Sequence, residues 1–374
     1  MGDASAAGVD GQPEKFEDTT EYANYFVTYG YLYHQKQMLE DHLRMVSYRD
    51  AMLKNRAQFA GKVVLDVGAG SGVLSIWAAQ AGAKKVYAVE ATDAAKFARM
   101  VVEHNGLAGV VEVIQKKVED IELPEKVDII VSEWMGYMLL RESMLDSVII
   151  ARDRWLKPGG ALYPSKATVY LAPIRTPLLV ERSTQLTSAL NEWGSFAQYM
   201  KDEHGIAVDC LNKAYEEEHK GYFLKTAQWK SLSADSVVGE ACAWYSFDCA
   251  TVTIEELKTK ASGPFLCAVN TSGPVHALAG WFDVEFNGSA DSPTETPVTL
   301  STAPHLGYTH WGQQVFLLSG QMFADRGDAV QGQGALARQP HNPRTLFFDV
   351  TYTLRRARPD AAEEHKRTIR YTID

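Results

Sequence analysis

The stretch SEWMGYMLLRE, Ser132–Glu142, carries a carboxylate near each end, Glu133 and Glu142, with mostly apolar and aromatic residues between them. A largely apolar run, Val127–Val131, precedes it. Two nearby carboxylates can do acid–base chemistry or capture a cation. In the simpler alternative, one is a solvated strand-end residue and the other a first-turn acid favoured by a helix dipole. Because a planar guanidinium pairs with carboxylates and stays charged at physiological pH, an arginine is one candidate cation.

A glycine-rich turn is the second chemical motif. The segment LDVGAGSG lies between an expected strand, Val63–Val67, and an expected helix, Val73–Ala81, and its glycines are Gly68, Gly70 and Gly72. Such glycines let the backbone approach a ligand at a helix N-terminus. Glu90 ends the next expected strand, where an acid can bind both hydroxyls of a ribose. The G-x-G-x-G spacing after Asp66 favours a methyl donor over NAD, and a tight turn without a ligand is the alternative.

The first half of the chain must position both motifs. Helical spacing extends from about Tyr22 to Arg56, and strands then alternate with helices, which predicts a doubly wound parallel sheet. Ligands bind beyond the carboxyl ends of strands in such sheets. Glu133 lies just beyond one strand end, and Glu142 lies at the start of a helix expected over Ser143–Leu156. Glycosidase chemistry also uses two carboxylates, but it has no need of the glycine turn.

The second half has a different pattern. Lys157–Gly160 is a strong turn signal, and beyond Ser165 most segments alternate as strands do, which predicts an antiparallel sandwich or barrel. One helical insert, Leu178–Gly221, interrupts it. The insert is expected to expose the apolar residues Leu186, Leu190, Trp193, Phe196 and Tyr199. An exposed apolar stripe of this kind predicts a partner surface.

Composition narrows the functional classes. The 374 residues favour two domains, and the net charge of −10 repels nucleic acid and attracts basic ligands. No apolar run reaches the ~20 residues that span a bilayer, and the first fifteen residues lack a secretory signal. The four cysteines lack zinc-site spacing, so free thiols and no metal are expected; they are Cys210, Cys242, Cys249 and Cys267.

Together the glycine turn, SEWMGYMLLRE and THW (Thr309–Trp311) resemble the protein arginine N-methyltransferases, from about Tyr22 to the chain end. The segment YFVTY resembles the Tyr-Phe-x-x-Tyr motif of this family, and YLYHQK and the insert resemble a plant-type member with a long dimerisation arm. The resemblance implies a doubly wound class I methyltransferase domain followed by an antiparallel β-barrel. The expected boundaries are a disordered tail at 1–20, an S-adenosylmethionine-binding domain with lid helices at 21–165, a barrel at 166–374 and an arm at 178–221.

The resemblance also implies residue roles. The expected catalytic residues are Glu133 and Glu142, which hold the guanidinium, and His310 paired with Asp41. Met144 and Trp311 are expected to contact the substrate, and Met38 and Met144 to border its reacting nitrogen. Arg141 stands where animal members commonly have an aromatic residue. The expected cofactor-binding residues are Tyr25, Phe26, Tyr29, His34, Met38, Arg44, Asp66, Gly68, Gly70, Gly72, Glu90, Val118 and Glu119.

The implied activity is type I arginine methylation. S-adenosylmethionine would donate methyl groups to arginines of histone tails and Arg-Gly-rich proteins, giving S-adenosylhomocysteine and mono- and asymmetric dimethylarginine. A homodimer in cytoplasm and nucleus is expected, without membrane or direct nucleic-acid binding. Two alternatives stay open: a methyltransferase acting on a small amine or nucleic acid, and a non-catalytic binder of arginine-rich tails. Labelled methyl transfer to an Arg-Gly peptide separates the first from arginine methylation, and cofactor binding separates the second.

Overall fold

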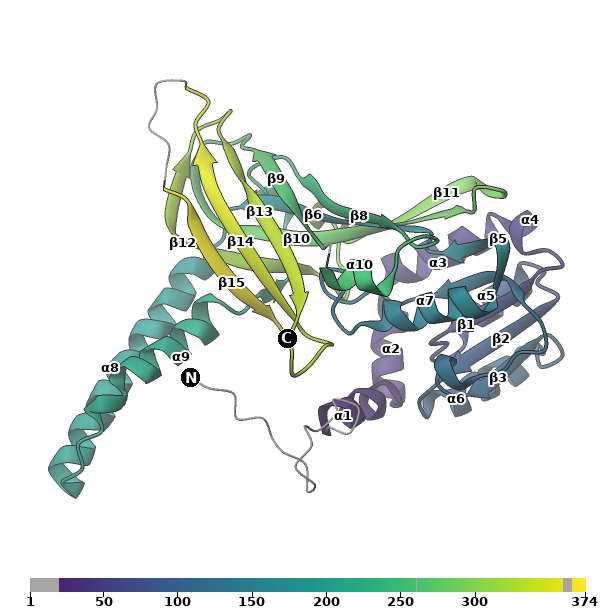
Figure 1. Ribbon diagram of the computed structural model, residues 1–374, viewed down its shortest axis with the longest axis horizontal. Coiled ribbons are helices and arrows are strands. Elements are labelled where there is room, and N and C mark those ends of the chain that lie inside the picture. Colours follow the sequence, from purple (N-terminus) through teal and green to yellow (C-terminus); the bar gives the residue numbers. More distant parts are fainter. Residues whose placement is uncertain (1–19, 260, 359–364) are drawn as a thin grey trace.

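The computed structural model describes residues 20–259, 261–358 and 365–374. The tail expected at 1–20 lies, apart from Thr20, outside the described residues. The rest forms a helical and parallel-sheet region beside an antiparallel region, from which a helical arm projects (Figure 1). The predicted α/β methyltransferase fold followed by an antiparallel β region is confirmed.

Four helices precede the parallel sheet: α1 (Thr20–Tyr29), α2 (Leu32–Glu40), α3 (His42–Leu53) and α4 (Arg56–Phe59). The helical conformation is interrupted between α2 and α3 at Asp41, whose backbone is extended. The Asp41 carboxylate accepts a hydrogen bond from the Arg44 amide at 3.1 Å and so caps α3. This cap fixes the direction in which α3 leaves the lid helices α1 and α2.

The parallel sheet is the doubly wound one that the sequence predicts. Its strand order is β3 (Val111–Gln115), β2 (Lys85–Glu90), β1 (Val63–Val67), β4 (Val127–Ser132) and β5 (Leu156–Tyr163). The helices packed on it are α5 (Val73–Gln80), α6 (Ala94–His104) and α7 (Met144–Trp155). All of β1 is buried, as its apolar run predicts for a strand covered on both faces. The glycine turn and Glu133 therefore follow the adjacent strands β1 and β4, at one edge of the sheet.

One turn prediction is wrong. The segment Lys157–Gly160 lies inside β5, which continues to Tyr163 and pairs with β4. The register between these strands shifts after Val127, so the turn-forming residues make a bulge instead of reversing the chain.

The second region contains two antiparallel sheets. The first has the order β7 (Gln228–Lys230), β12 (Gln313–Ala324), β10 (Gly273–Gly288), β6 (Lys166–Ile174) and β8 (Cys242–Asp248), with β11 (Pro293–Ser301) also paired to β10. The second has the order β15 (Arg367–Ile373), β14 (Leu346–Arg355), β13 (Ala329–Arg338) and β9 (Ser262–Ala268). The sheet edges meet where β8 approaches β9 and β12 approaches β15, and the predicted closure into a barrel rests on these contacts.

Short helices complete the fold: α10 (Ile254–Thr259) and the 3-10 turns Val118–Asp120, Asp209–Leu211, Ala234–Ser236 and Pro304–Leu306. The two regions are joined by side-chain contacts as well as by the chain. The Asn55 side chain donates to the Thr296 carbonyl at 2.8 Å and accepts from its amide at 2.9 Å, which fixes β11 against the end of α3. The boundary expected near residue 165 stays a prediction.

The insert forms a two-helix arm, α8 (Leu178–His204) and α9 (Asn212–Leu224), that extends away from the sheets (Figure 1). Leu186 is buried, contrary to the prediction of exposure. Trp193 is half-buried because its ring stacks on Tyr215 at 4.3 Å and its N–H donates to Asn212 at 2.7 Å. These contacts hold α8 against α9, so Trp193 stabilises the arm itself. Among the described helices, none is long and apolar enough to cross a membrane.

Candidate active site

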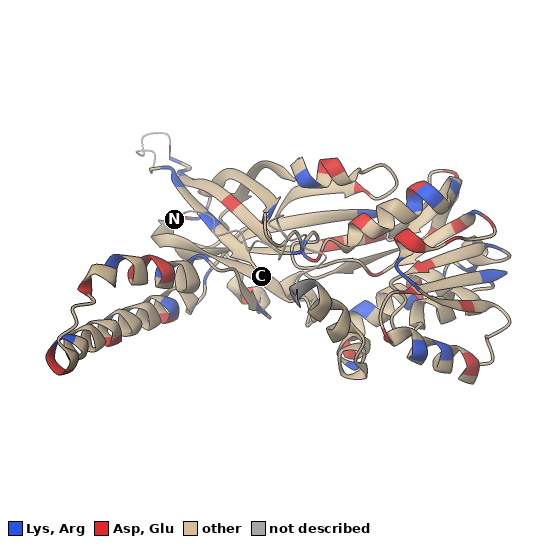
Figure 2. Ribbon diagram, turned by 60° about the horizontal axis from the view of Figure 1, so that its bottom comes forward, with Lys and Arg blue, Asp and Glu red and all other residues tan. Residues whose placement is uncertain are grey.

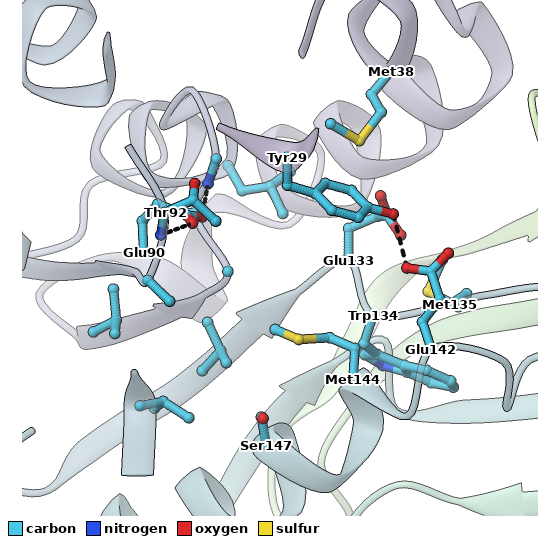
Figure 3. A pocket seen from close by; sticks show the side chains of 18 of the residues that line it. Tyr29, Met38, Glu90, Thr92, Glu133, Trp134, Met135, Glu142, Met144 and Ser147 are labelled. Atoms are coloured by element: carbon cyan, nitrogen blue, oxygen red, sulfur yellow. Dashed lines mark hydrogen bonds between the residues drawn. The ribbon is translucent and has the colours of Figure 1, made fainter. Parts of the chain in front are cut away.

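A cavity of about 630 Å³ lies at the carboxyl edge of the parallel sheet. Its wall combines the lid helices, the glycine turn, the end of β2, the loop at 133–143 (the double-glutamate loop) and two segments of the antiparallel region. Figure 3 shows Glu133 and Glu142 near the Tyr29 ring, with Glu90 at another part of the same cavity. This volume is that of a typical small-ligand site.

The double-glutamate loop holds an unusual backbone conformation. Four of its non-glycine residues have positive φ angles: Met138 (51°), Leu139 (65°), Glu142 (76°) and Ser143 (57°). Such residues cost about 1–3 kcal/mol each and persist only where packing enforces them. Most of the apolar residues between the glutamates are buried, which supplies that packing. Gly136 is required because a Cβ there would lie 2.1 Å from the Arg141 carbonyl oxygen.

The antiparallel region anchors this loop at Glu142. The Glu142 amide donates to the Arg344 carbonyl at 2.7 Å, and the Arg344 guanidinium donates back to the Glu142 carbonyl at 2.9 Å. The Ser143 hydroxyl donates to the Pro343 carbonyl at 2.6 Å. Trp311 is buried and its N–H donates to the Met135 carbonyl at 2.7 Å. The second region thus sets the position of the double-glutamate loop, which belongs to the first.

The Glu142 carboxylate is held by two donors. The Tyr29 hydroxyl donates to Oε2 at 2.8 Å (Figure 3), and the Arg141 guanidinium donates to Oε1 at 3.0 Å. The Glu133 carboxylate accepts from Nε of Arg44 at 3.1 Å, and both of these side chains are about nine-tenths buried. A carboxylate has about four acceptor positions, so each glutamate can still accept from a guanidinium inside the cavity.

Asp41 and His310 form the predicted pair. The Asp41 carboxylate is fully buried and accepts from His310 Nδ1 at 2.7 Å and from the His310 amide at 2.8 Å. Burial opposes ionisation, but the hydrogen bonds from His310 and Arg44 outweigh it and lower the Asp41 pKa below its ordinary value. An ionised Asp41 thereby connects the N-terminus of α3 to the THW segment, which borders the cavity.

The other end of the cavity suits a nucleoside. Glu90 ends β2, is 7% exposed and accepts from the amides of Gly70 at 2.8 Å and Thr92 at 2.7 Å. Its remaining lone pairs can accept from ribose hydroxyls. Gly70 has a φ of +54°, a left-handed conformation that favours glycine, and the Gln35 amide oxygen of α2 lies 2.7 Å from where a Cβ would be.

Asp66 lies beneath the glycine turn. Its side chain is fully buried and accepts from the Ser75 hydroxyl at 2.7 Å. Burial raises the pKa of Asp66 to about 7, with the nearby Glu90 charge acting in the same direction and the Ser75 hydrogen bond acting against it. Across the described chain, Asp66 Oδ1 has no hydrogen-bond partner, which leaves a buried acceptor next to the nucleoside end of the cavity.

Most of the predicted site residues meet at the cavity. Its wall includes Phe26, Tyr29, Met38, Arg44, Gly68, Gly70, Glu90, Val118, Glu119, Glu133, Glu142, Met144, His310 and Trp311. Asp41 and Asp66 lie behind the wall. Asp41 contacts the wall residue His310, and Asp66 contacts Ser75, which is next in the chain to a wall residue. Two further predicted residues that the structure describes, His34 and Gly72, are not in the wall. The side chain of Tyr25 is outside what the structure describes.

Among the wall residues absent from the sequence-based prediction are four polar ones: Gln35, Thr92, Ser147 and Arg344. Gln35 is buried and donates to the Tyr29 carbonyl at 3.0 Å, so it takes the place in the lid that was expected for His34. Ser147 donates to Glu119 at 2.6 Å. The strand-end position of Thr92, two residues after Glu90, is the one local signal that could have indicated a cavity residue.

The cavity fits S-adenosylmethionine, the donor implied by the resemblance. Glu90 is placed for a ribose, and apolar side chains such as Val118 border the same end. Arg44 binds Glu133 through Nε and has further N–H donors for a carboxylate. When bound, this cofactor supplies an activated methyl group. Within residues 20–259, 261–358 and 365–374, no group of three His, Cys, Asp or Glu side chains is arranged to hold a metal ion.

Two family models match the chain. Residues 165–357 match the arginine methyltransferase oligomerization subdomain, and residues 64–160 match a methyltransferase domain. Protein arginine N-methyltransferase PRMT10 of Oryza sativa subsp. japonica is 48% identical over 352 residues, which cover 94% of this chain and 93% of that protein. The PRMT10 protein of Arabidopsis thaliana is 42% identical over 368 residues, covering 98% and 96% respectively.

Solved structures of arginine methyltransferases superpose on this chain. The crystal structure of Arabidopsis thaliana protein arginine methyltransferase 10, described as uniquely open, superposes with a TM-score of 0.91 at 42% identity, over 94% of this chain and all of that chain. The Trypanosoma brucei PRMT1 enzyme–prozyme complex with AdoHcy gives a TM-score of 0.75 at 31% identity, over 92% and 99%. This chain therefore belongs to the protein arginine N-methyltransferases, enzymes that use S-adenosylmethionine to methylate arginine side chains of proteins.

Proposed function

We propose that this enzyme is a type I arginine methyltransferase, which converts arginine through monomethylarginine to asymmetric dimethylarginine. The observation that carries the proposal is the arrangement of two glutamates with two methionines around one end of the cavity. In Figure 3, Met38 and Met144 lie on opposite sides of Tyr29, Glu133 and Glu142, and they come from helices α2 and α7. Two methyl groups on one nitrogen need room at that nitrogen and none at the other.

The glutamates would activate the substrate through charge. An arginine with a pKa above ~12 has poorly nucleophilic nitrogens. Glu133 and Glu142 would bind two of these nitrogens and draw the positive charge toward them, which leaves lone-pair character on the nitrogen that faces the donor. The lid helices would exclude water, and Tyr29 would fix Glu142 as they close. Alignment of this kind can supply about 7–11 kcal/mol of the barrier.

The product of the purified enzyme tests the type I proposal. Incubation with S-adenosylmethionine and an Arg-Gly peptide should give monomethylarginine first and asymmetric dimethylarginine later, because Met38 and Met144 restrict access to a single nitrogen. Acid hydrolysis and chromatography separate these amino acids. Symmetric dimethylarginine would refute the proposal, and an accumulation of monomethylarginine alone would refute the second transfer.

We further expect Glu90→Ala to weaken cofactor binding at least about tenfold, because hydrogen bonds to a charged group are worth ~1.5–3 kcal/mol each. Calorimetry with S-adenosylhomocysteine measures the affinity. The matched control is Glu122→Ala, since Glu122 is an exposed glutamate paired with Arg154 on the surface. Equal affinity of the Glu90 variant and the control would show that the ribose binds elsewhere.

The proposed substrates are histone tails and Arg-Gly-rich proteins, methylated in the cytoplasm and nucleus by a homodimer. The net charge of −10 favours basic substrates over nucleic acid. Figure 2 shows positively and negatively charged residues interspersed along the methyltransferase helices and the arm. A nucleic acid would need a continuous positive surface instead. The match to an oligomerization subdomain and the exposed apolar residues of the arm support the homodimer.

A further inference from the structure

Arg141 is a cation that lies beside Glu142, at the double-glutamate end of the cavity. Its guanidinium lies 3.0 Å from Glu142 Oε1 and 5.4 Å from the centre of the Tyr137 ring, and its side chain is 25% exposed. Tyr137 and Glu142 belong to the cavity wall, whereas Arg141 is not among the described wall residues. The guanidinium therefore approaches Glu142 from behind the wall and leaves the cavity open.

The position of Arg141 matters because it shares a carboxylate with the substrate. Glu133 is already paired with Arg44, and Glu142 with Arg141, so these four groups sum to zero charge before an arginine arrives. The substrate guanidinium then adds one positive charge next to a guanidinium that stays ionised at any physiological pH. Attraction at Glu142 is thereby weakened, and further positive charge near this point is disfavoured.

The Tyr137 ring links the Arg141 guanidinium to the cavity wall. Tyr137 interacts electrostatically with Arg141, with Glu142 and with Tyr308, and Tyr308 is 60% exposed. The Arg141 Nε atom is buried, and no described residue accepts a hydrogen bond from it. A partly buried charge is screened much less by salt than an exposed one, so residues beside a bound arginine meet its field.

We propose that Arg141 is a specificity-determining residue that selects against peptides with basic residues beside the target arginine and favours acidic or uncharged neighbours. This rests on the proposed binding of the substrate guanidinium by Glu142. The net charge of −10 attracts basic proteins at long range, whereas Arg141 acts on the residues within contact distance. The enzyme would then favour basic proteins as substrates but, within such a protein, would favour arginines without basic neighbours.

Steady-state kinetics on three peptides test this. The peptides differ only in the residues flanking one arginine, which are glycine, lysine or aspartate. For the unmodified enzyme we expect kcat/KM on the lysine peptide to be about tenfold below that on the glycine peptide, since like charges in contact cost this much or more. Arg141→Gln should bring the two within about twofold through a lower KM, and Arg141→Lys should keep the original ratio because it keeps the charge.

The matched control is Arg49→Gln, which removes a surface arginine paired with Asp50, outside the cavity wall. This control should keep the original ratio. An unchanged ratio in Arg141→Gln, or a fall in kcat at an unchanged ratio, would overturn the proposal. If Arg141→Gln does not fold, the unmodified enzyme decides: equal kcat/KM on the glycine and lysine peptides overturns the proposal. An active Glu142→Gln enzyme would instead refute the proposed binding of the guanidinium by Glu142. Failure of that proposal can therefore be told apart from failure of the specificity proposal for Arg141.

Discussion

Replacing Glu142 by glutamine should reduce kcat by about 10²–10³ while cofactor affinity stays within a few-fold. Loss of one preorganised electrostatic contact to reacting charge typically has an effect of this size. The substitution keeps the shape of the side chain and its ability to accept from the Tyr29 hydroxyl, but it removes the negative charge that would polarise the substrate. Single-turnover methylation of an Arg-Gly peptide measures the rate.

Calorimetry with S-adenosylhomocysteine on the same preparation shows whether the glutamine variant retains its fold and cofactor site. Glu142 contacts Tyr29, Arg141 and Arg344, and Glu90 occupies the nucleoside end, so the two effects are separable. A variant that keeps a tenth of the original rate would contradict the role of Glu142 as half of a guanidinium clamp.

Replacing Phe196 and Tyr199 together by aspartate should convert the enzyme to monomers and weaken cofactor binding about tenfold. Both side chains lie on α8 and are 45% and 54% exposed. Burying one large apolar side chain is worth ~1.5–3 kcal/mol, so two charges there should prevent association. The lid helices present their own exposed apolar residues, Val27, Tyr31, Leu32 and Tyr33. A two-fold dimer would let each arm cover the other subunit's lid and so favour the closed cofactor site.

Sedimentation measures the oligomeric state, and calorimetry measures the cofactor affinity of the same sample. Phe323→Asp serves as the control, because Phe323 is an exposed aromatic residue of β12, outside the arm. Trp193 is a poor test, since its loss would disturb the contact between α8 and α9 within one subunit. A dimer in the double variant, or a monomer with unchanged affinity, would mean that the arm serves another purpose.

The chemical motifs are predictable from the sequence because each is contiguous. The glycine turn and the double-glutamate loop each directly follow a buried strand, and the carboxyl ends of parallel strands bring them together. Arg344 could not be found this way, since it reaches Glu142 from 202 residues along the chain. His34 and Gln35 are neighbours on one helix, and the sequence alone does not show which of them faces the cavity.

The antiparallel region is less predictable, for reasons that concern particular residues. The strand β11 contains two prolines, and β13 contains two glycines, both of which argue against strands in a sequence. Trp193 has the helical spacing of an exposed stripe, yet the return of α9 along α8 covers it. The Lys157–Gly160 segment has the proline and glycine that are typical of turns. The same residues also occur in bulges, and here they form one.

A crystal structure with S-adenosylhomocysteine and an Arg-Gly peptide tests the central claim most directly, namely that Glu133 and Glu142 together bind the substrate guanidinium. The account predicts that each carboxylate lies about 2.7–2.9 Å from a guanidinium nitrogen, with Met38 and Met144 beside the nitrogen that faces the sulfur. A guanidinium bound outside the space between these glutamates, with Glu133 and Glu142 contacting only groups of the enzyme itself, would contradict it.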